Sequence, residues 1–330
     1  MRTGDLTTPA LVVEAARLEA NLATMAAVLP GARLRPHVKA HKCTALARRQ
    51  AAHGHRRFTC ATIAEVEGMA AAGLGEDLLL ANEVADAGRL GRLARSGARV
   101  TLAVDSEETI AAAVAGGVGE VVIDVNVGLP RCGCDPGDAG RLAESARARG
   151  LLVRGVMGYE GHIVGLADRA RRIEMIGPAM EALVAAHDDV GGELISAGGT
   201  GTYDINTWAT EIQAGSYAVV DTAYTELGLP FEQALSIEAT VISVSPRWAV
   251  ADCGLKAVAM DHGNPTIEGS QVWFFSDEHV TFEPGRPLTV GERIRVIPAH
   301  VDPTVAKHRT IFVVDGDDVL DSWSVDLRGW

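Results

Sequence analysis

Short apolar runs rich in β-branched residues alternate with helical stretches along the first two thirds of this 330-residue chain. Apolar strands separated by amphipathic helices predict a parallel sheet that is covered by helices. The runs interpreted as strands are residues 33–40, 57–62, 77–82, 100–105, 120–126, 151–159, 193–200 and 213–221. Eight such strands within about 200 residues favour an α/β fold of the (β/α)₈ TIM-barrel type, and a doubly wound open sheet is the alternative.

The pattern changes after about residue 228, where the helical period ends. Strand-like segments punctuated by Gly and Pro follow, among them "LSIEATVISV" and "TIFVVDGDDVLDSWSV". A chain of this length accommodates two domains. We predict a barrel over residues 10–228 and an all-β domain over residues 229–330, which residues 1–9 join as a strand.

Composition excludes several classes of partner. The formal net charge of −13 disfavours nucleic acids and anionic membrane surfaces, because both require a basic face. No apolar run approaches the length that spans a bilayer, and the first residues lack the pattern of a signal peptide. The five cysteines show no paired metal-binding spacing and predict reduced thiols. We therefore expect a cytoplasmic protein that binds neither nucleic acid nor membrane.

Lysine is scarce in this chain, yet one lysine ends the first predicted strand. There are four lysines against 26 arginines, and Lys39 lies in "RPHVKAHKC". Active sites of barrels lie at the C-terminal ends of the strands. A desolvated lysine has a lowered pKa, and its neutral amine forms Schiff bases with carbonyl compounds. The alternative is an exposed strand-end lysine without a role.

A glycine-rich segment, "SAGGTGTYD" (196–204), follows the seventh predicted strand. Glycines let backbone N–H groups approach a phosphate, and barrel phosphate sites favour the loops after strands seven and eight. The segment "QAGSY" at the eighth strand would complete such a cradle, although an ordinary glycine-rich turn explains the first segment equally well. A Schiff-base lysine and a phosphate cradle together suggest pyridoxal 5′-phosphate (PLP). A sugar-phosphate aldolase barrel would use both features too, but it would not need the β-domain.

The order of these motifs resembles the fold-type III, alanine-racemase-like PLP enzymes. Within that group the chain resembles the D-threonine aldolase and D-serine dehydratase family. The matching segments cover almost the whole chain, and they include "RPHVKAHKC", "DVNVGLPRCG", "GVMGYEGHI", "SAGGTGTYD", "QAGSYAVVD", "ADCGLKAVAMDHG" and "PAHVDPTV".

The resemblance implies a role for individual residues. Lys39 would carry PLP, Arg131 would lie beside the cofactor, and Tyr159 would lie near its pyridine ring. His162 is a candidate acid/base, although the sequence after Tyr159 departs from that of many aldolases of the family. The residues matching the phosphate-binding segments are Gly199, Thr200, Gly215, Ser216 and Tyr217. The resemblance further implies a metal pair, His300 and Asp302, and a homodimer.

The pair His300-x-Asp302 also has a reading of its own. Two residues that are two apart on an extended segment point to the same side and can reach one ion. A carboxylate ligand favours Mn²⁺ or Mg²⁺, with Ca²⁺ and Zn²⁺ as alternatives. The competing interpretation is a His and an Asp in a loop flanked by proline. Dehydratases of the family typically carry H-x-C with zinc, so Asp302 favours an aldolase.

These observations predict a PLP- and metal-dependent lyase, a low-specificity D-threonine aldolase. It would cleave D-β-hydroxy amino acids to glycine and an aldehyde. The first alternative is a D-serine or D-3-hydroxyamino-acid dehydratase, which gives a keto acid and ammonia. Further alternatives are an amino-acid racemase and a non-catalytic PLP carrier.

Overall fold

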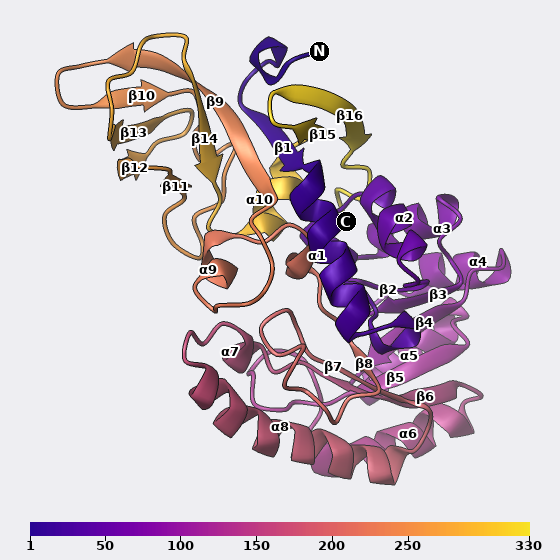
Figure 1. Ribbon diagram of the computed structural model, residues 1–330. Helices are drawn as coiled ribbons and strands as arrows, with labels where there is room; N and C mark the ends of the chain where they lie inside the picture. Colours follow the sequence, from indigo (N-terminus) through magenta and orange to yellow (C-terminus); the bar gives the residue numbers. More distant parts are fainter. The chain divides into compact units, whose positions relative to one another are not determined.

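The computed structural model describes all residues 1–330, which divide into two compact units (Figure 1). The barrel unit comprises residues 25–39, 46–215 and 327–330. The β unit comprises residues 1–24, 40–45 and 216–326. Each unit is described by itself.

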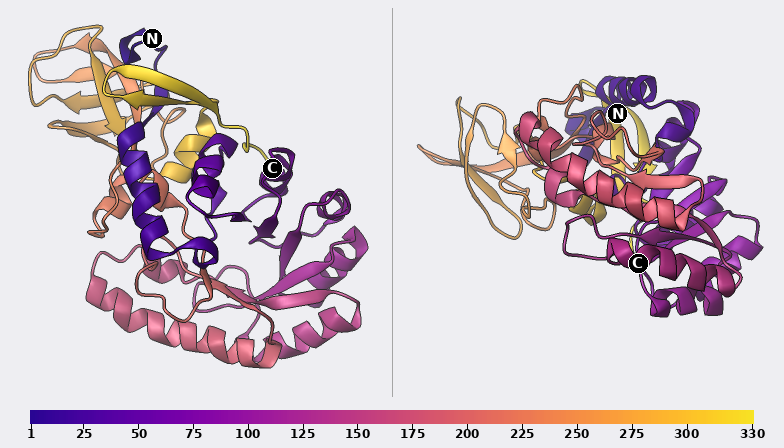
Figure 2. Two further views of the ribbon diagram at one scale, coloured as in Figure 1. Left: turned by 45° about the vertical axis from the view of Figure 1, so that its right-hand side comes forward. Right: turned by 90° about the horizontal axis from the view of Figure 1, so that it is seen from below.

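The barrel unit contains a parallel sheet of seven strands in the order β2-β3-β4-β5-β6-β7-β8, with helices in the connections (Figure 2). This curled sheet confirms the predicted barrel-type α/β fold class. The strands are β2 (Arg57–Cys60), β3 (Asp77–Leu80), β4 (Val100–Val104), β5 (Glu120–Asp124), β6 (Leu152–Gly158), β7 (Leu194–Ala197) and β8 (Glu211–Ile212). The helices are α3 (Ile63–Ala71), α4 (Gly88–Arg95), α5 (Glu107–Gly116), α6 (Ala139–Ala148), α7 (Gly161–Val164) and α8 (Arg169–Val190), with α2 (Thr44–Ala52) beginning in residues of the β unit.

The first predicted strand, residues 33–40, is not a strand in the structure. Its residues are flanked by the 3-10 turns η2 (Gly31–Arg33) and η3 (Val38–Ala40). Leu34 forms a parallel bridge with Ile212 of β8, and His37 forms one with Thr59 of β2. Pro36 has no N–H to donate, so a regular ladder cannot run through it. The segment nevertheless occupies the first-strand position, because it connects β8 to β2.

The last predicted strand, residues 213–221, is also not a strand in the structure, because β8 ends at Ile212 just before it. Only Glu211 and Ile212 pair with β7, and the chain then turns through the 3-10 helix η5 (Ser216–Ala218). Val220 adopts a positive φ of 48°, a conformation that interrupts extended backbone. The apolar run 217–220 is therefore buried without being a strand.

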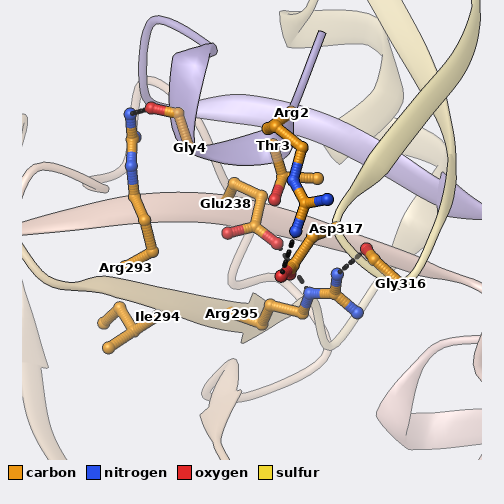
Figure 3. Close-up of a pocket in the computed structure, with 9 residues that line it drawn as sticks. All are labelled: Arg2, Thr3, Gly4, Glu238, Arg293, Ile294, Arg295, Gly316 and Asp317. Atoms are coloured by element: carbon orange, nitrogen blue, oxygen red, sulfur yellow. Dashed lines mark hydrogen bonds and ion pairs between the residues drawn. The ribbon is translucent and has the colours of Figure 1, made fainter.

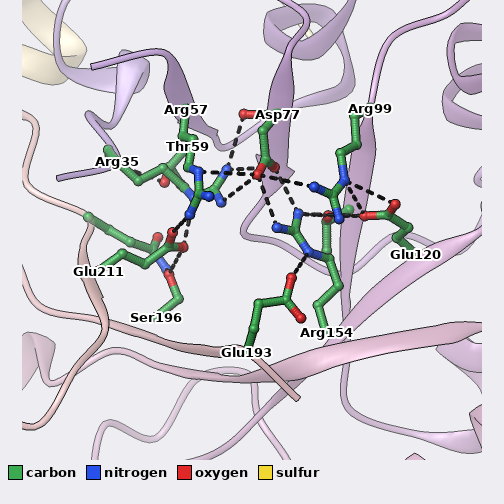
Figure 4. Close-up of polar contacts among 12 residues, drawn as sticks. Arg35, Arg57, Thr59, Asp77, Arg99, Glu120, Arg154, Glu193, Ser196 and Glu211 are labelled. Atoms are coloured by element: carbon green, nitrogen blue, oxygen red, sulfur yellow. Dashed lines mark hydrogen bonds and ion pairs between the residues drawn. The ribbon is translucent and has the colours of Figure 1, made fainter. Parts of the chain in front are cut away.

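The interior of the barrel unit has an apolar layer and a charged layer. The apolar layer consists of side chains from β3 to β7: Leu79, Ala103, Val122, Met157 and Leu194. The charged layer lies at the N-terminal ends of the strands, where Asp77 begins β3 and Glu211 begins β8 (Figure 4). Arg35 bridges these two acids, with Nε 2.7 Å from Glu211 and Nη1 3.0 Å from Asp77. In a barrel this end serves stability and the opposite end carries chemistry.

The β unit is built on a nine-stranded sheet with the main order β12-β13-β10-β9-β1-β15-β16. Strand β1 (Ala10–Glu14) pairs antiparallel with β9 (Leu235–Val244) and parallel with β15 (Thr310–Asp315). The remaining strands are β10 (Ala249–Ala251), β11 (Thr266–Ile267), β12 (Gln271–Phe275), β13 (Val280–Glu283), β14 (Arg293–Ile297) and β16 (Asp318–Ser324). Helix α1 (Ala15–Val28) follows β1, and the short helices α9 (Thr222–Thr225) and α10 (Val301–Lys307) interrupt the β region. None of the helices has the length and apolar character that crossing a membrane requires.

Candidate active site

Lys39 lies in η3, directly after the bridge at His37. Its neighbours Val38 and Ala40 are fully buried, whereas Lys39 itself is half-buried. The backbone N–H of Lys39 lies 3.5 Å from Nδ1 of His37. The buried neighbours fix the backbone of Lys39, and the lysine stands at the C-terminal end of the first-strand position, as the sequence predicts.

Arg131 and Tyr159 are brought together in the barrel unit. The Arg131 guanidinium carbon lies 5.3 Å from the centre of the Tyr159 ring, which is a cation–π contact. Both side chains help to line one small pocket with Asp124 and Asn126. Backbone hydrogen bonds between Asn126 N–H and the Cys134 carbonyl (2.9 Å), and between Cys134 N–H and the Asp124 carbonyl (2.9 Å), pin the loop that carries Arg131.

The sequence predicts no role for the acids around this pocket, and it predicts reduced, structural thiols at Cys132 and Cys134. Burial raises the pKa of Asp124, and the negative charge of Glu83 raises it further. Burial also raises the pKa of Cys134 to about 12. A thiol with such a pKa is not a nucleophile at neutral pH. Cys134 therefore has a structural role rather than a chemical one.

His162 lies in α7, two residues after Glu160, and its ring packs against Gly128. A Cβ atom at Gly128 would lie 2.9 Å from Cε1 of His162. Nδ1 of His162 is buried and has no hydrogen-bond partner in the structure. The ring is therefore held in place while one nitrogen keeps its capacity for hydrogen bonding or proton exchange.

The glycine-rich segment follows β7 in a tight turn. Gly198 has a φ of +84°, which favours glycine. A Cβ at Gly201 would lie 1.8 Å from the Val164 carbonyl oxygen, so only glycine fits there. Thr200 is buried beside Gly199, and Gly215 follows β8 on the same unit. Close backbone approach of this kind suits a phosphate cradle.

The remaining predicted cofactor residues belong to the β unit. Ser216 and Tyr217 are buried in η5, and the Tyr217 ring lies 5.8 Å from that of Phe231. The same motif ends in Asp221, which accepts hydrogen bonds from Tyr224 N–H (3.0 Å) and Val301 N–H (3.0 Å). Asp221 therefore ties the segment after Tyr217 to the backbone between His300 and Asp302.

His300 and Asp302 are brought together, but not on an extended segment. His300 is the extended residue before α10, and Asp302 lies in the first turn of that helix. Nε2 of His300 lies 3.7 Å from Oδ2 of Asp302. This separation is too long for a hydrogen bond and allows both atoms to bind one cation. One imidazole and one carboxylate are a donor set that divalent ions accept, so the two residues fit the predicted metal.

Two further residues, Asp261 and His262, contact the His300 ring. Nδ1 of His300 lies 2.6 Å from Oδ2 of Asp261, and the His262 ring stacks on His300 with centroids 3.8 Å apart. Asp261, His262 and His300 place their donor atoms within 4.8 Å of one another. Sequence reasoning missed Asp261 and His262, although both lie in the motif "MDHG", 38 or more residues before His300.

An arginine-lined hollow of the β unit is a different kind of feature (Figure 3). Arg2 pairs with Asp317 at 3.1 Å, and Arg295 pairs with Glu238 at 2.6 Å. Arg293 donates to the carbonyl of Leu6 at 2.7 Å. These guanidinium groups bind protein atoms, so we interpret the hollow as structural.

The barrel unit, with its lysine at the first-strand position and its glycine-rich turn after β7, together with the β sheet, defines the fold-type III class of PLP-dependent enzymes. The chain belongs to the family described as "Alanine racemase, N-terminal domain", which matches residues 13–222. The description "Putative serine dehydratase domain" matches residues 234–314.

Full-length relatives confirm the predicted family. The chain is 35% identical to a D-threonine aldolase of Arthrobacter sp., over 98% of this chain and 93% of the relative. It is 32% identical to a 3-hydroxy-D-aspartate aldolase of Paracoccus denitrificans (strain Pd 1222), over 100% of this chain and 94% of the relative. The crystal structure of D-threonine aldolase from Filomicrobium marinum superposes with a TM-score of 0.94 at 34% identity, covering 100% of this chain and 97% of the other. The prediction of a carbon–carbon lyase agrees with all three.

Proposed function

We propose that this protein is a PLP- and metal-dependent aldolase that cleaves D-configured β-hydroxy amino acids to glycine and an aldehyde. The observation that carries the proposal is the pair His300 and Asp302, whose donor atoms lie 3.7 Å apart. Dehydratases of the family that the sequence resembles place a thiolate where this chain has Asp302. Full-length similarity to a D-threonine aldolase supports the same activity.

Lys39 and its neighbours would hold the cofactor. PLP, when bound, supplies an electron sink for the carbanion that forms as the Cα–Cβ bond breaks. Lys39 supplies the amine that attaches PLP, a task arginine cannot perform at neutral pH. Arg131 and Tyr159, which contact each other, would orient the ring. The turn at Gly199, with Thr200 and Gly215, followed in the chain by Ser216 and Tyr217, would form the phosphate site.

His300 and Asp302 would hold the divalent ion, Mn²⁺ or Mg²⁺. Such an ion supplies Lewis-acid polarisation of an oxygen atom, and two protein ligands leave positions for water or substrate. His162 is proposed as the base that accepts the proton of the β-hydroxyl group. Its Nδ1 has no hydrogen-bond partner in the structure, which leaves that nitrogen available for the task.

The second candidate is a dehydratase of the same substrates. The match of residues 234–314 to a "Putative serine dehydratase domain" favours it. A dehydratase would form a keto acid and ammonia, so the products alone separate the two activities.

We also propose a homodimer in the cytoplasm, acting on a small amino acid. Light scattering coupled to size exclusion tests the dimer, and a monomer at micromolar concentration would contradict it.

The experiment that tests the function uses purified protein with PLP, Mn²⁺ and D-threonine. Glycine and acetaldehyde, lost when a chelator is added and restored by Mn²⁺, are the expected products. Formation of 2-oxobutanoate and ammonia would contradict the aldolase activity and show that the protein is a dehydratase. L-Threonine is the control substrate, and its cleavage at an equal rate would contradict the proposed D-specificity.

A further inference from the structure

Glu160 is a fully buried acid at the C-terminal end of β6, directly before α7. Acids are almost never fully buried unless they are paired. The partners of Glu160 are not cations: Oε2 accepts Gly198 N–H at 3.2 Å, and Oε1 accepts the Thr202 hydroxyl at 2.8 Å. Asn206 Nδ2 lies 3.4 Å from the same Oε1. One carboxyl group therefore binds both ends of the glycine-rich segment.

Thr202 extends this network to a second glycine. Its hydroxyl oxygen accepts the N–H of Gly199 at 3.1 Å while its hydrogen is donated to Glu160. The N–H groups of Gly198 and Gly199 are thus used inside the loop. The Thr202 N–H donates to the Gly199 carbonyl at 3.1 Å, so a phosphate bound here would be met by the N–H groups of Thr200 and Gly201 and by the Thr200 hydroxyl.

The turn that carries Glu160 leads into α7, and the end of α7 packs against the glycine-rich segment. The Glu160 carbonyl accepts Ile163 N–H at 2.8 Å, which begins α7. At the end of α7, the carbonyl oxygen of Val164 lies only 1.8 Å from the position that a Cβ atom on Gly201 would take. The segment 198–202 is therefore fixed by hydrogen bonds to Glu160 and by close packing on Val164.

Burying a carboxyl group without a cation partner costs desolvation free energy. Burial raises the pKa of Glu160, although its hydrogen bonds with Thr202 and Gly198 act in the opposite direction. If the side chain at this position only filled the core, an apolar residue would do so at a lower cost in free energy. The acid at position 160 instead binds Gly198 and Thr202 together.

We propose that Glu160 is the positioning residue of the phosphate cradle: it sets the shape of residues 198–202 through Gly198 and Thr202, so that the segment binds a phosphate monoester. The inference rests on the proposed function, since it takes the phosphate of PLP as the ligand. Glu160 acts through the loop and does not itself touch the phosphate.

The experiment compares PLP with pyridoxal, which has the same ring and aldehyde without the phosphate. Dissociation constants for both are measured by absorbance titration of the apoprotein, for wild type, Glu160→Gln, Glu160→Ala and Thr202→Val. We expect PLP binding to weaken by about tenfold or more in Glu160→Ala and Thr202→Val, as for the loss of buried hydrogen bonds. Glu160→Gln keeps one acceptor oxygen and should fall between wild type and Glu160→Ala. Pyridoxal binding should change by less than about twofold, because the ring contacts remain.

Thr210→Val is the matched control. The Thr210 hydroxyl accepts the N–H of Ile195 at 2.9 Å, so the same chemical group is removed in the same unit outside the loop. This variant should keep the wild-type preference for PLP over pyridoxal. If Glu160→Ala does not fold, Thr202→Val and Glu160→Gln decide the question.

Equal weakening of PLP and pyridoxal, or no weakening of either, would overturn the inference while leaving the proposed function standing. Wild-type protein that binds neither compound would overturn the proposed cofactor and this inference with it.

Discussion

Asp77 and Arg154 form a doubly hydrogen-bonded ion pair inside the barrel unit, with Nη1 2.8 Å from Oδ1 and Nη2 3.0 Å from Oδ2. Arg154 is buried in β6, and Arg35 binds the same carboxylate from the first-strand position. Asp77 is therefore shared by two buried arginines, each of which also binds a second carboxylate, Glu211 or Glu193. Since the pair lies at the N-terminal ends of the strands, it serves stability rather than chemistry.

Replacing Asp77 by Asn should destabilise the protein without changing the activity of the molecules that remain folded. Two buried guanidinium groups would lose the carboxylate that they share and keep only their second acids, and breaking a buried pair costs about 3–5 kcal/mol. Urea unfolding measures the loss, and the exposed substitution Asp188→Asn is the control. A loss of less than about 1 kcal/mol would mean that the network stabilises the protein no more than an exposed ion pair does.

The pH dependence of stability should carry the signature of the same residue. Burial alone would raise the pKa of Asp77, but hydrogen bonds and charge from Arg154 and Arg35 hold it well below its ordinary value. A lowered carboxyl pKa stabilises the fold above the unfolded pKa of about 4, and the contribution is lost as the pH falls toward the folded value. The stability gap between wild type and Asp77→Asn should therefore narrow from pH 7 to about pH 3. A gap that stays constant or widens in acid would contradict this linkage.

The strands β2 to β7 could be predicted because each is a short buried run whose signal is local. The segment around Pro36 misled the prediction, because its alternation is that of a strand while its hydrogen bonds are only isolated bridges. Its position between β8 and β2 depends on residues far away in the chain. Alternation alone does not contain that information.

The site residues, like the strands, could be predicted only where the signal in the sequence is local. Lys39 could be proposed because lysine is rare in this chain, and His300 with Asp302 because their spacing is short and local. Glu160 and Asp261 were missed because their partners lie 38 or more residues away in the sequence. A buried acid whose partners are backbone N–H groups and hydroxyls leaves no pattern in the sequence around it.

Lys39→Arg should abolish attachment of PLP and all turnover while preserving the fold. The substitution keeps the positive charge, but a guanidinium does not react with the aldehyde at neutral pH. Borohydride reduction followed by peptide mass spectrometry should find the cofactor on Lys39 in the wild type only. Lys42→Arg is the control and should retain labelling. Labelling of any other lysine in the wild type would refute the assignment.

Asp261→Ala should weaken binding of Mn²⁺ by about 10–100-fold, the usual effect of removing a carboxylate that orients a histidine ligand. Asp261 fixes Nδ1 of His300, and this leaves Nε2 directed to the side of Asp302. Paramagnetic resonance of free Mn²⁺ measures the affinity without reference to turnover. Asp277→Asn, an exposed acid of the same unit, should leave the affinity unchanged. Equal affinities in wild type and Asp261→Ala would show that His300 needs no such support.

Gly201→Ala should release PLP from an otherwise folded protein. The new methyl group would lie 1.8 Å from the Val164 carbonyl oxygen, so the glycine-rich segment must move away from α7. Gly165→Ala is the matched control, because it adds the same methyl group one residue after Val164, where nothing lies within 4 Å. Thermal melting of the apoproteins reports the fold, and ultrafiltration with absorbance of the retained fraction reports the bound cofactor. PLP should be lost from Gly201→Ala and kept by Gly165→Ala, while both apoproteins melt cooperatively. Retention of PLP by Gly201→Ala at the wild-type affinity would mean that the loop tolerates displacement, and that the phosphate is bound by other residues.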